Sequence, residues 1–216
     1  MKSPPARNRR ADALRSRAAI LDAATQVLNV DPDAGLEAIA GVAGVTRPTV
    51  YAHFPSREKL LLAVVERITD EALAAMDAVD LNAGTATETL LHMIDAGAQV
   101  TERYPVLLRM ISAQPVSAEA DRDRHLPVAD RIRQVIEQGQ QAGEFDDRLP
   151  VDWLVASTIS LGHTASTEQD AGRLPPTVAR DVLHASLLRL LGAAEPADAP
   201  ASRPSPPATN AGVSGG

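Results

Sequence analysis

The sequence contains no cysteine, and aromatic residues make up only 2% of its 216 residues. Without cysteine, the chain forms no disulfide, no zinc finger and no thiol-based switch, which fits a cytoplasmic protein. With so few aromatic side chains, the core must be built from Ala, Leu, Val and Ile. Ala and Leu favour helices, whereas the β-branched and aromatic residues that favour strands are comparatively scarce. The composition therefore predicts an all-α protein.

Long apolar segments are also absent. The longest aliphatic run, LLLAVV at residues 60–65, is far shorter than the roughly 20 residues that a membrane-spanning helix needs. The charged N-terminal stretch is followed by no apolar segment, so it does not have the pattern of a secretory signal. We therefore expect no membrane as a partner.

The charge is distributed unevenly along the chain. The formal net charge is −7, yet residues 1–60 contain nine Lys and Arg against six Asp and Glu, while residues 61–216 contain twelve against twenty-two. A basic N-terminal part is suited to phosphate groups, and an acidic remainder is not. This asymmetry predicts a phosphate-facing N-terminal module attached to an acidic body.

The N-terminal part has the spacing of several helices. Residues 1–12 are rich in Pro and Arg and predict a flexible basic arm. Apolar residues recur at helical spacing over residues 15–29 and 36–43. A short helix over residues 47–53 follows, with Thr46 as its N-cap and Pro48 in its first turn. Ser56 caps a long helix that continues to about residue 79. We expect one domain over residues 13–68, with its last helix extending beyond it.

The remainder predicts a helical bundle over residues 80–193. Its helices are expected over residues 87–103, 105–113, 128–142, 151–166 and 176–191. Residues 114–126 are expected to form a polar loop, with at most a turn of helix. Residues 194–216 are rich in Pro, Ala, Ser and Gly and contain almost no large apolar residues. Such a segment cannot offset the entropy lost on ordering, so we predict a disordered tail.

The two short helices joined by a tight turn at Gly44 are typical of a helix-turn-helix, whose second helix enters the DNA major groove. Arg47 would contact a guanine edge or a phosphate, and Thr49 a thymine methyl group or a phosphate. Tyr51 and His53 would donate to flanking phosphates. Arg57 begins the next helix, where free N–H groups also favour an anion. The alternative is an ordinary polar surface helix, with Tyr51 and His53 as packing residues.

The stretch LEAIAGVAGVTRPTVYAHFPSREKLLLAVVERI, residues 36–68, resembles the N-terminal domain of TetR-type (tetracycline-repressor-like) transcriptional regulators. With the preceding helix, the resemblance covers residues 13–68. It implies a three-helix DNA-binding domain, with Phe54, Ala43 and Val45 in its core, followed by a helical-bundle domain that binds an effector and dimerises. It also implies that operator DNA contacts Arg47, Pro48, Thr49, Tyr51, His53 and Arg57.

One part of the motif departs from the family pattern. Many members begin the first helix of the motif with Ser or Thr, which meets a phosphate. Here Gly35 and Leu36 occupy that place, and Glu37 stands where some members carry Arg. The basic arm, with three arginines, is a candidate for the missing contact, through the minor groove or the backbone. These arginines are Arg7, Arg9 and Arg10.

Effector pockets are mostly apolar with a few polar groups, so we look for polar side chains among the apolar helices of the body. With few aromatic residues, such a pocket would be aliphatic and would take an apolar or amphipathic small molecule. The histidines are too scattered for a metal site, although His92 and Asp95 share one helix face, and we predict neither metal nor cofactor. The pocket candidates are His92, Met93, Arg109, Met110, Gln114, Trp153 and Ser157.

The last helix has two apolar stripes, which predicts burial on two faces. One stripe contains Leu183, Leu187 and Leu190, and the other contains Val178, Val182 and Ala185. The helix over residues 151–166 carries small residues that permit close helix approach. We expect these two helices to form a four-helix homodimer interface, with a larger intrachain core as the alternative. The predicted interface residues are Ser160, Leu183, Leu187 and Leu190.

Together these features predict a dimeric, ligand-responsive regulator that represses transcription and is released from a palindromic operator on double-stranded DNA by a small molecule. One alternative is a helical enzyme or metal-binding protein that uses the N-terminal motif only for association. We predict no enzyme, because no nucleophile–base pair, phosphate loop or metal motif appears in the sequence. A second alternative, an architectural DNA-binding protein without a ligand, would not require so large a helical body.

Overall fold

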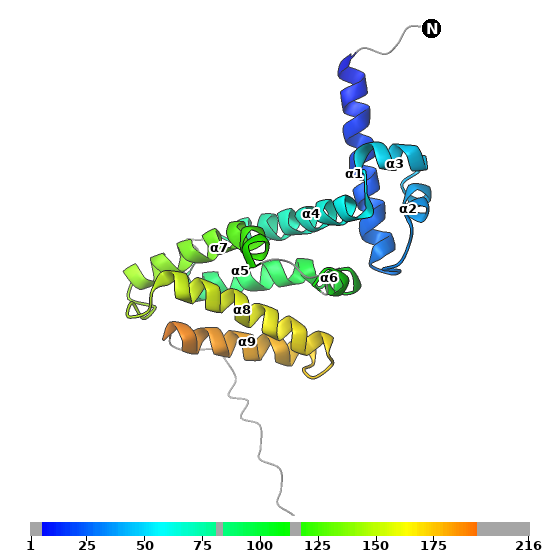
Figure 1. Cartoon of the computed structure of the whole chain (residues 1–216). Coiled ribbons are helices and arrows are strands. Elements are labelled where there is room, and N and C mark those ends of the chain that lie inside the picture. The colour runs from blue at the N-terminus through cyan, green and yellow to red at the C-terminus, as the bar shows by residue number, and fades with distance from the viewer. Residues whose placement is uncertain (1–5, 81–83, 113–117, 194–216) are drawn as a thin grey trace, which may run out of the picture.

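The computed structural model describes residues 6–80, 84–112 and 118–193, and within these ranges it contains nine helices and no strand. The first three are α1 (Ala6–Leu28), α2 (Leu36–Val42) and α3 (Arg47–His53). They form a head at one end of the molecule, and α4 (Arg57–Asp77) runs from this head into a body of the remaining helices (Figure 1). The all-α architecture predicted from composition is therefore confirmed.

The body contains five helices. They are α5 (Ala86–Thr101), α6 (Pro105–Ser112), α7 (Ala118–Gln141), α8 (Val151–Asp170) and α9 (Pro176–Leu191). Helix α5 packs against α4 and α7, α7 packs against α8, and α8 packs against α9. The body is thus layered, with α4 at the edge nearest the head and the α8–α9 pair at the opposite edge (Figure 1).

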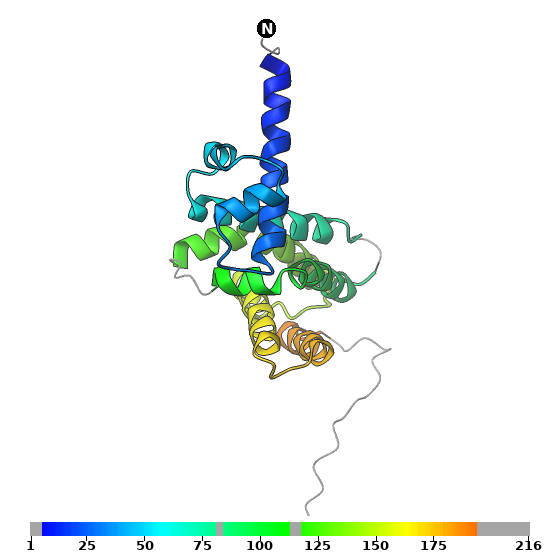
Figure 2. The same ribbon diagram turned by 90° about the vertical axis from the view of Figure 1, so that its right-hand side faces the viewer.

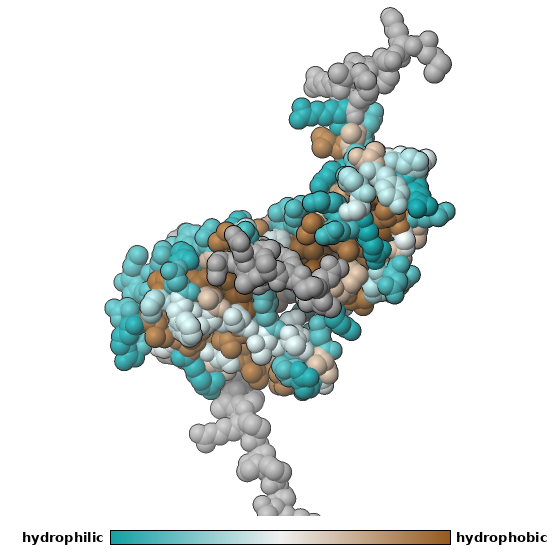
Figure 3. Space-filling view, in the orientation of Figure 1, coloured by the Kyte–Doolittle hydropathy of each residue, from teal (hydrophilic) through white to brown (hydrophobic). Residues whose placement is uncertain are grey.

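Two apolar clusters hold the molecule together. The first is the core of the head, in which Ile20, Ile39, Val50 and Leu60 are fully buried, and it continues into the body as far as Leu107. The second lies inside the body. Because the first cluster includes the start of α6, the head and the body share apolar contacts. Figure 3 shows brown apolar side chains where the two parts meet.

Local sequence signals set several helix ends. Ser56 caps α4 by accepting a hydrogen bond from the backbone N–H of Lys59, at 3.2 Å. Thr85 and Glu88 form a reciprocal capping box at the start of α5. Gly192 ends α9 in the left-handed conformation, with φ of 66°, which a residue with a Cβ adopts only at a cost.

Helix α1 begins earlier than the sequence predicted. The expected flexible arm covered residues 1–12, but α1 starts at Ala6, so residues 6–12 are helical. Ala and Arg, which make up most of this stretch, favour helices even without an apolar pattern. In both views α1 projects beyond the other helices of the head (Figures 1 and 2).

Helix α7 also begins earlier than expected. A loop was predicted over residues 114–126, but the helix starts at Ala118 and continues through Pro127. The loop was predicted from the polarity of the stretch, whereas its Ala, Glu and Arg residues favour a helix. The predicted disordered tail, residues 194–216, lies outside the described residues. In the described part of the chain, no helix combines the length and the apolar character needed to cross a bilayer.

Candidate nucleic-acid interface and effector body

Helix α3 is fixed to the head by its caps and by two buried side chains. The hydroxyl oxygen of Thr46 accepts a hydrogen bond from the backbone N–H of Thr49 and lies 2.8 Å from the Thr49 hydroxyl. Val50 is fully buried, and Phe54, which follows the helix, is 3% exposed. These anchors hold one face of α3 against the head and leave the opposite face to solvent.

The exposed face of α3 presents a basic and an aromatic side chain next to each other. Arg47 and Tyr51 are both exposed and lie one helical turn apart. The Arg47 guanidinium lies 5.6 Å from the centre of the Tyr51 ring, and one of its N–H groups donates to the Tyr51 hydroxyl at 3.4 Å. The hydrogen bond to Tyr51 raises the pKa of Arg47 above its ordinary value. A guanidinium is protonated at neutral pH with or without this contact, so the face is positively charged.

The other predicted contact residues of α3 differ in how accessible their side chains are to solvent. Pro48 is exposed, but Thr49 and His53 are half-buried. The Thr49 hydroxyl is engaged with Thr46, and the His53 ring lies 6.4 Å from the ring of Phe54. Arg47, Pro48 and Tyr51 are therefore the most accessible of the predicted contact residues on α3.

Arg57 has a structural role that the sequence did not reveal. Its guanidinium is half-buried and donates hydrogen bonds to the backbone carbonyl oxygens of Ala34 and Pro32, in the turn between α1 and α2. A guanidinium has five N–H donors, so others remain for a phosphate. Arg57 thus joins the start of α4 to the turn that precedes α2.

Residues 20–64, which run from the buried half of α1 through α2 and α3 into α4, match the family described as bacterial regulatory proteins, tetR family. The chain belongs to the TetR family. It is 29% identical to the HTH-type transcriptional repressor LfrR of Mycolicibacterium smegmatis over 139 residues, which are 64% of this chain and 71% of LfrR. It is 36% identical over 66 residues to the HTH-type transcriptional regulator EthR of Mycobacterium tuberculosis, which covers 30% of this chain and 31% of EthR.

Solved structures extend the TetR likeness to the body. The structure of LfrR from Mycobacterium smegmatis in complex with proflavine is 26% identical and has a TM-score of 0.57, with 80% of this chain and 95% of that chain covered. A TetR-family regulator from Rhodococcus sp. shares the fold, with a TM-score of 0.67 at 23% identity over 82% of this chain and 98% of that chain. The chain is thus a TetR-family transcriptional regulator with a helix-turn-helix head and a helical body.

A polar clamp connects this head to the body. Asn29, directly after α1, donates from its side-chain amide to the carbonyl oxygen of Arg103 at 3.0 Å and accepts from the backbone N–H of Leu107 at 3.3 Å. Glu71 of α4 accepts hydrogen bonds from Arg103 and from the Tyr104 hydroxyl, both at 3.2 Å. The turn between α5 and α6 is therefore held by α1 on one side and by α4 on the other.

The seven predicted pocket residues do not come together. Met93 is buried in the core of the body, whereas Met110 packs against the cluster that fills the head. Trp153 is 61% exposed, because the next two residues of α8 take the inward positions. The other candidates are no more convergent: His92 and Arg109 are exposed, Ser157 is half-buried, and Gln114 lies outside the described residues.

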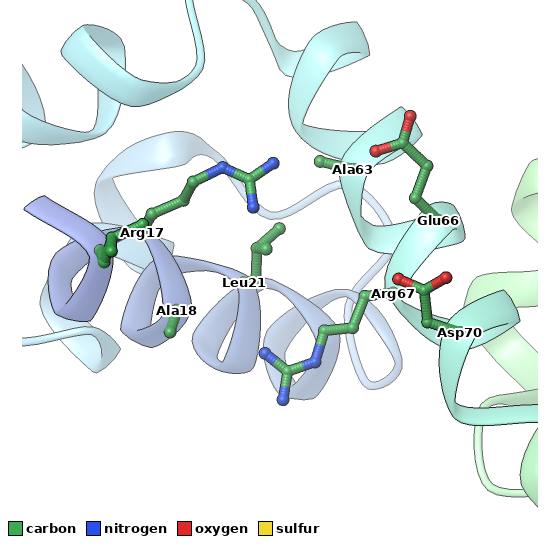
Figure 4. Close-up of a pocket in the computed structure, with 8 residues that line it drawn as sticks. Arg17, Ala18, Leu21, Ala63, Glu66, Arg67 and Asp70 are labelled. Atoms are coloured by element: carbon green, nitrogen blue, oxygen red, sulfur yellow. The ribbon is translucent and has the colours of Figure 1, made fainter. Parts of the chain in front are cut away.

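Two hollows in the described residues are large enough to consider as binding sites, and one of these two contains a predicted residue. A groove of about 260 Å³ lies between α1 and α4, with Arg17 and Leu21 on one side and Ala63 and Glu66 on the other (Figure 4). None of the seven pocket candidates lines it. A cavity of about 70 Å³ lies in the body and is lined by Met76, Asp77, Val79, Met93, Arg131 and Gln134.

An ion pair closes one side of the body cavity. Arg131 of α7 donates two hydrogen bonds to the carboxylate of Asp77, both at 2.7 Å. These bonds hold the pKa of Asp77 below its ordinary value. The apolar part of the wall comes from Met76, Val79 and Met93. Sequence reasoning missed all of these residues except Met93, because residues 76–79 and Arg131 lie more than fifty positions apart in the chain.

The predicted dimer interface needs a correction. Leu187 is fully buried within its own chain, and Leu183 and Leu190 are half-buried, so their stripe of α9 faces the core of the same subunit. The other stripe is the exposed one, with Val178 at 42% and Val182 at 48% exposure. The remaining predicted residue, Ser160 of α8, is exposed. Both stripes have helical spacing, and only packing against α8 shows which one is covered.

A further ionic group joins α5 to α9. The Asp95 carboxylate accepts hydrogen bonds from Arg180, and one of its oxygens lies 2.8 Å from Nε2 of His184. Burial raises the pKa of Asp95, but the hydrogen bonds and charges of His184 and Arg180 lower it more, so it lies below its ordinary value. Asp95 was considered beside His92 as a metal pair. Within the described ranges, no group of three or more His, Cys, Asp or Glu residues is arranged to hold a metal ion.

Proposed function

We propose that this TetR-family regulator is a dimeric repressor that binds a palindromic operator through α3 and leaves it when a small molecule binds to the body. The observation that carries the proposal is the exposed Arg47–Tyr51 pair on a helix whose opposite face is anchored by Val50. A bidentate arginine reads guanine in the major groove, and a tyrosine hydroxyl donates to phosphate. The head supplies both groups on one short helix.

Dimerisation follows from what one α3 can read. Two helices related by a twofold axis read half-sites about 34–36 Å apart, whereas a single helix contacts too few base pairs to select one site in a genome. Exposed apolar side chains on α8 and α9 suit the contact between two copies, and they include Trp153, Val178 and Val182. These two helices lie side by side at the edge of the body away from α4 (Figure 1).

The proposed effector is a small apolar or amphipathic molecule. The LfrR structure contains proflavine, which supports a small-molecule effector for this relative. The body cavity offers methionine side chains, which adapt to irregular shapes, and the charged Arg131 at its wall. Because α4 carries Met76 of this cavity and begins directly after the helix-turn-helix, a ligand that moves α4 would move α3.

The test is binding to a duplex that the wild-type protein selects from a random-sequence pool. Arg47→Ala should weaken binding and relax the preference at one base pair in each half-site, by about 1–3 kcal/mol. Arg148→Ala, in the turn between α7 and α8, is a matched control that removes the same charge from the body. If the wild type enriches no sequence, or if Arg47→Ala binds the selected duplex as the control does, the proposed reading helix is wrong.

A further inference from the structure

The N-terminal part of α1 is a helix that packs against little of its own chain. The first fully buried residue of α1 is Ile20, and no described side chain between Arg10 and Ala18 is buried. Residues 6–18, here called the projecting segment, correspond to about 20 Å of helix at 1.5 Å per residue. Both views show this segment rising past α3, on the side of the head away from the body (Figures 1 and 2).

The projecting segment is strongly basic. Its thirteen residues contain five arginines and one acidic residue, Asp12, whereas the whole chain has a net charge of −7. Asp12 pairs with Arg15, whose side chain is 73% exposed. The like charges of the segment repel one another. A polyanion would remove that repulsion.

The base of the segment is fixed next to the reading helix. The Arg17 guanidinium lies 5.3 Å from the centre of the Phe54 ring, and Phe54 is the residue that ends α3. Arg10 precedes Arg17 by seven residues, about two helical turns, which places the two on one face of the helix. This arginine face is therefore the face of α1 turned towards the end of α3.

We propose that the projecting segment is a rigid basic helix that binds the DNA phosphate backbone beside the groove occupied by α3. The major groove is only about 8.5 Å deep, so a helix that continues past a seated α3 must run along the flank of the duplex. There it meets closely spaced phosphates. The segment reads no base and lengthens the footprint of each half-site, and it differs from a flexible arm because its helix is continuous with the head.

This inference rests on the proposed DNA binding, and the first experiment separates the two. Arg7→Ala/Arg10→Ala is compared with the matched variant Arg148→Ala/Arg173→Ala, which removes the same charge from turns of the body. Binding to the selected duplex is measured against salt concentration. The first variant should lower the slope of log K against log salt by about 4, at roughly 0.9 for each of the four phosphate contacts that the two subunits of a dimer would lose, and the control should not. Equal slopes would overturn the inference, whereas failure of the wild type to select a duplex would overturn the proposed function.

A second experiment tests the rigid helix. Ala13→Pro keeps every charge but breaks the helix at an exposed position, and Ala13→Ser is its control. Hydroxyl-radical footprinting should show that Ala13→Pro loses protection of the phosphates flanking each half-site, while the central protection and the melting temperature stay as in Ala13→Ser. Full flanking protection with Ala13→Pro would mean that the segment acts as a flexible arm. A change of oligomeric state in Arg7→Ala/Arg10→Ala, without a change in salt slope, would mean that the segment binds protein. Either result overturns the proposal.

Discussion

The guanidinium of Arg57 donates a hydrogen bond to the backbone carbonyl oxygen of Ala34, twenty-three residues earlier in the chain. A second bond from the same side chain reaches the carbonyl oxygen of Pro32. The first turn of α4 is thereby tied to the segment that leads into α2. The position of α3 between them depends on this connection as well as on its own apolar anchors.

Arg57→Ala should therefore destabilise the protein in addition to removing a charge near DNA. The loss of two hydrogen bonds from a charged donor should lower the free energy of unfolding by about 1–3 kcal/mol. Urea denaturation followed by circular dichroism measures this change. Arg47→Ala, on the exposed face of α3, should unfold at nearly the wild-type urea concentration. Equal stability of the two variants would show that Arg57 does not brace the head.

Asn29 should be a stabilising contact between the head and the body. The backbone N–H of Leu107 lies in the first turn of α6 and has no acceptor in its own helix, and the Asn29 side chain supplies one. Asn29→Ala should lower the free energy of unfolding by about 1–2 kcal/mol, as the loss of a helix cap does. It should also speed hydrogen exchange at the Leu107 amide. Gln26→Ala, at an exposed position near the end of α1, is the control and should leave both unchanged.

Two substitutions on α9 should affect different properties, one the stability of the subunit and the other its dimerisation. Leu187 is fully buried in its own subunit, so Leu187→Ala should cost about 2–5 kcal/mol of stability. Val182 is 48% exposed, so Val182→Arg should change the stability of an isolated subunit by no more than about 0.5 kcal/mol. In the proposed dimer it should instead give a monomer that loses the selected palindrome. Sedimentation velocity and a gel-shift assay on one sample measure both. A dimeric Val182→Arg protein would exclude this stripe as the interface.

The contribution of Asp95 to the free energy of unfolding should fall as the pH is lowered. Its folded-state pKa lies below the ordinary value, which is about 3.9 in an unfolded chain. The ionised form is therefore stabilising above that pH, and the stabilisation is lost as the pH falls through the folded pKa. Asp95→Asn should be less stable than the wild type at neutral pH by about 1–3 kcal/mol, since it loses charge-assisted bonds to Arg180 and His184. The difference should shrink as urea denaturation is repeated at pH values below about 4. If wild type and Asp95→Asn differed in stability by the same amount at every pH, the ionised Asp95 carboxylate would not be stabilising the fold.

The sequence was sufficient wherever a local interaction decides the structure. Thr46 and Ser56 mark the starts of α3 and α4 because a hydroxyl can accept from a nearby backbone N–H, and Gly192 marks the end of α9 because it adopts a positive φ. Composition, apolar spacing and the motif around Arg47 likewise predicted an all-α chain with a helix-turn-helix. These signals act between residues a few positions apart, so they can be read without coordinates.

Only the tertiary structure decided what each side chain faces. The sequence could not show that Leu187 is inside and Val182 outside, because two apolar stripes on one helix look equivalent until α8 covers one of them. It could not show that Arg57 reaches back to Pro32 and Ala34. It also could not show that α1 continues past α3 as a helix, since a basic stretch without apolar spacing is equally compatible with an arm. Burial and long-range hydrogen bonds join residues that are distant in the chain, and their energies depend on where the helices pack.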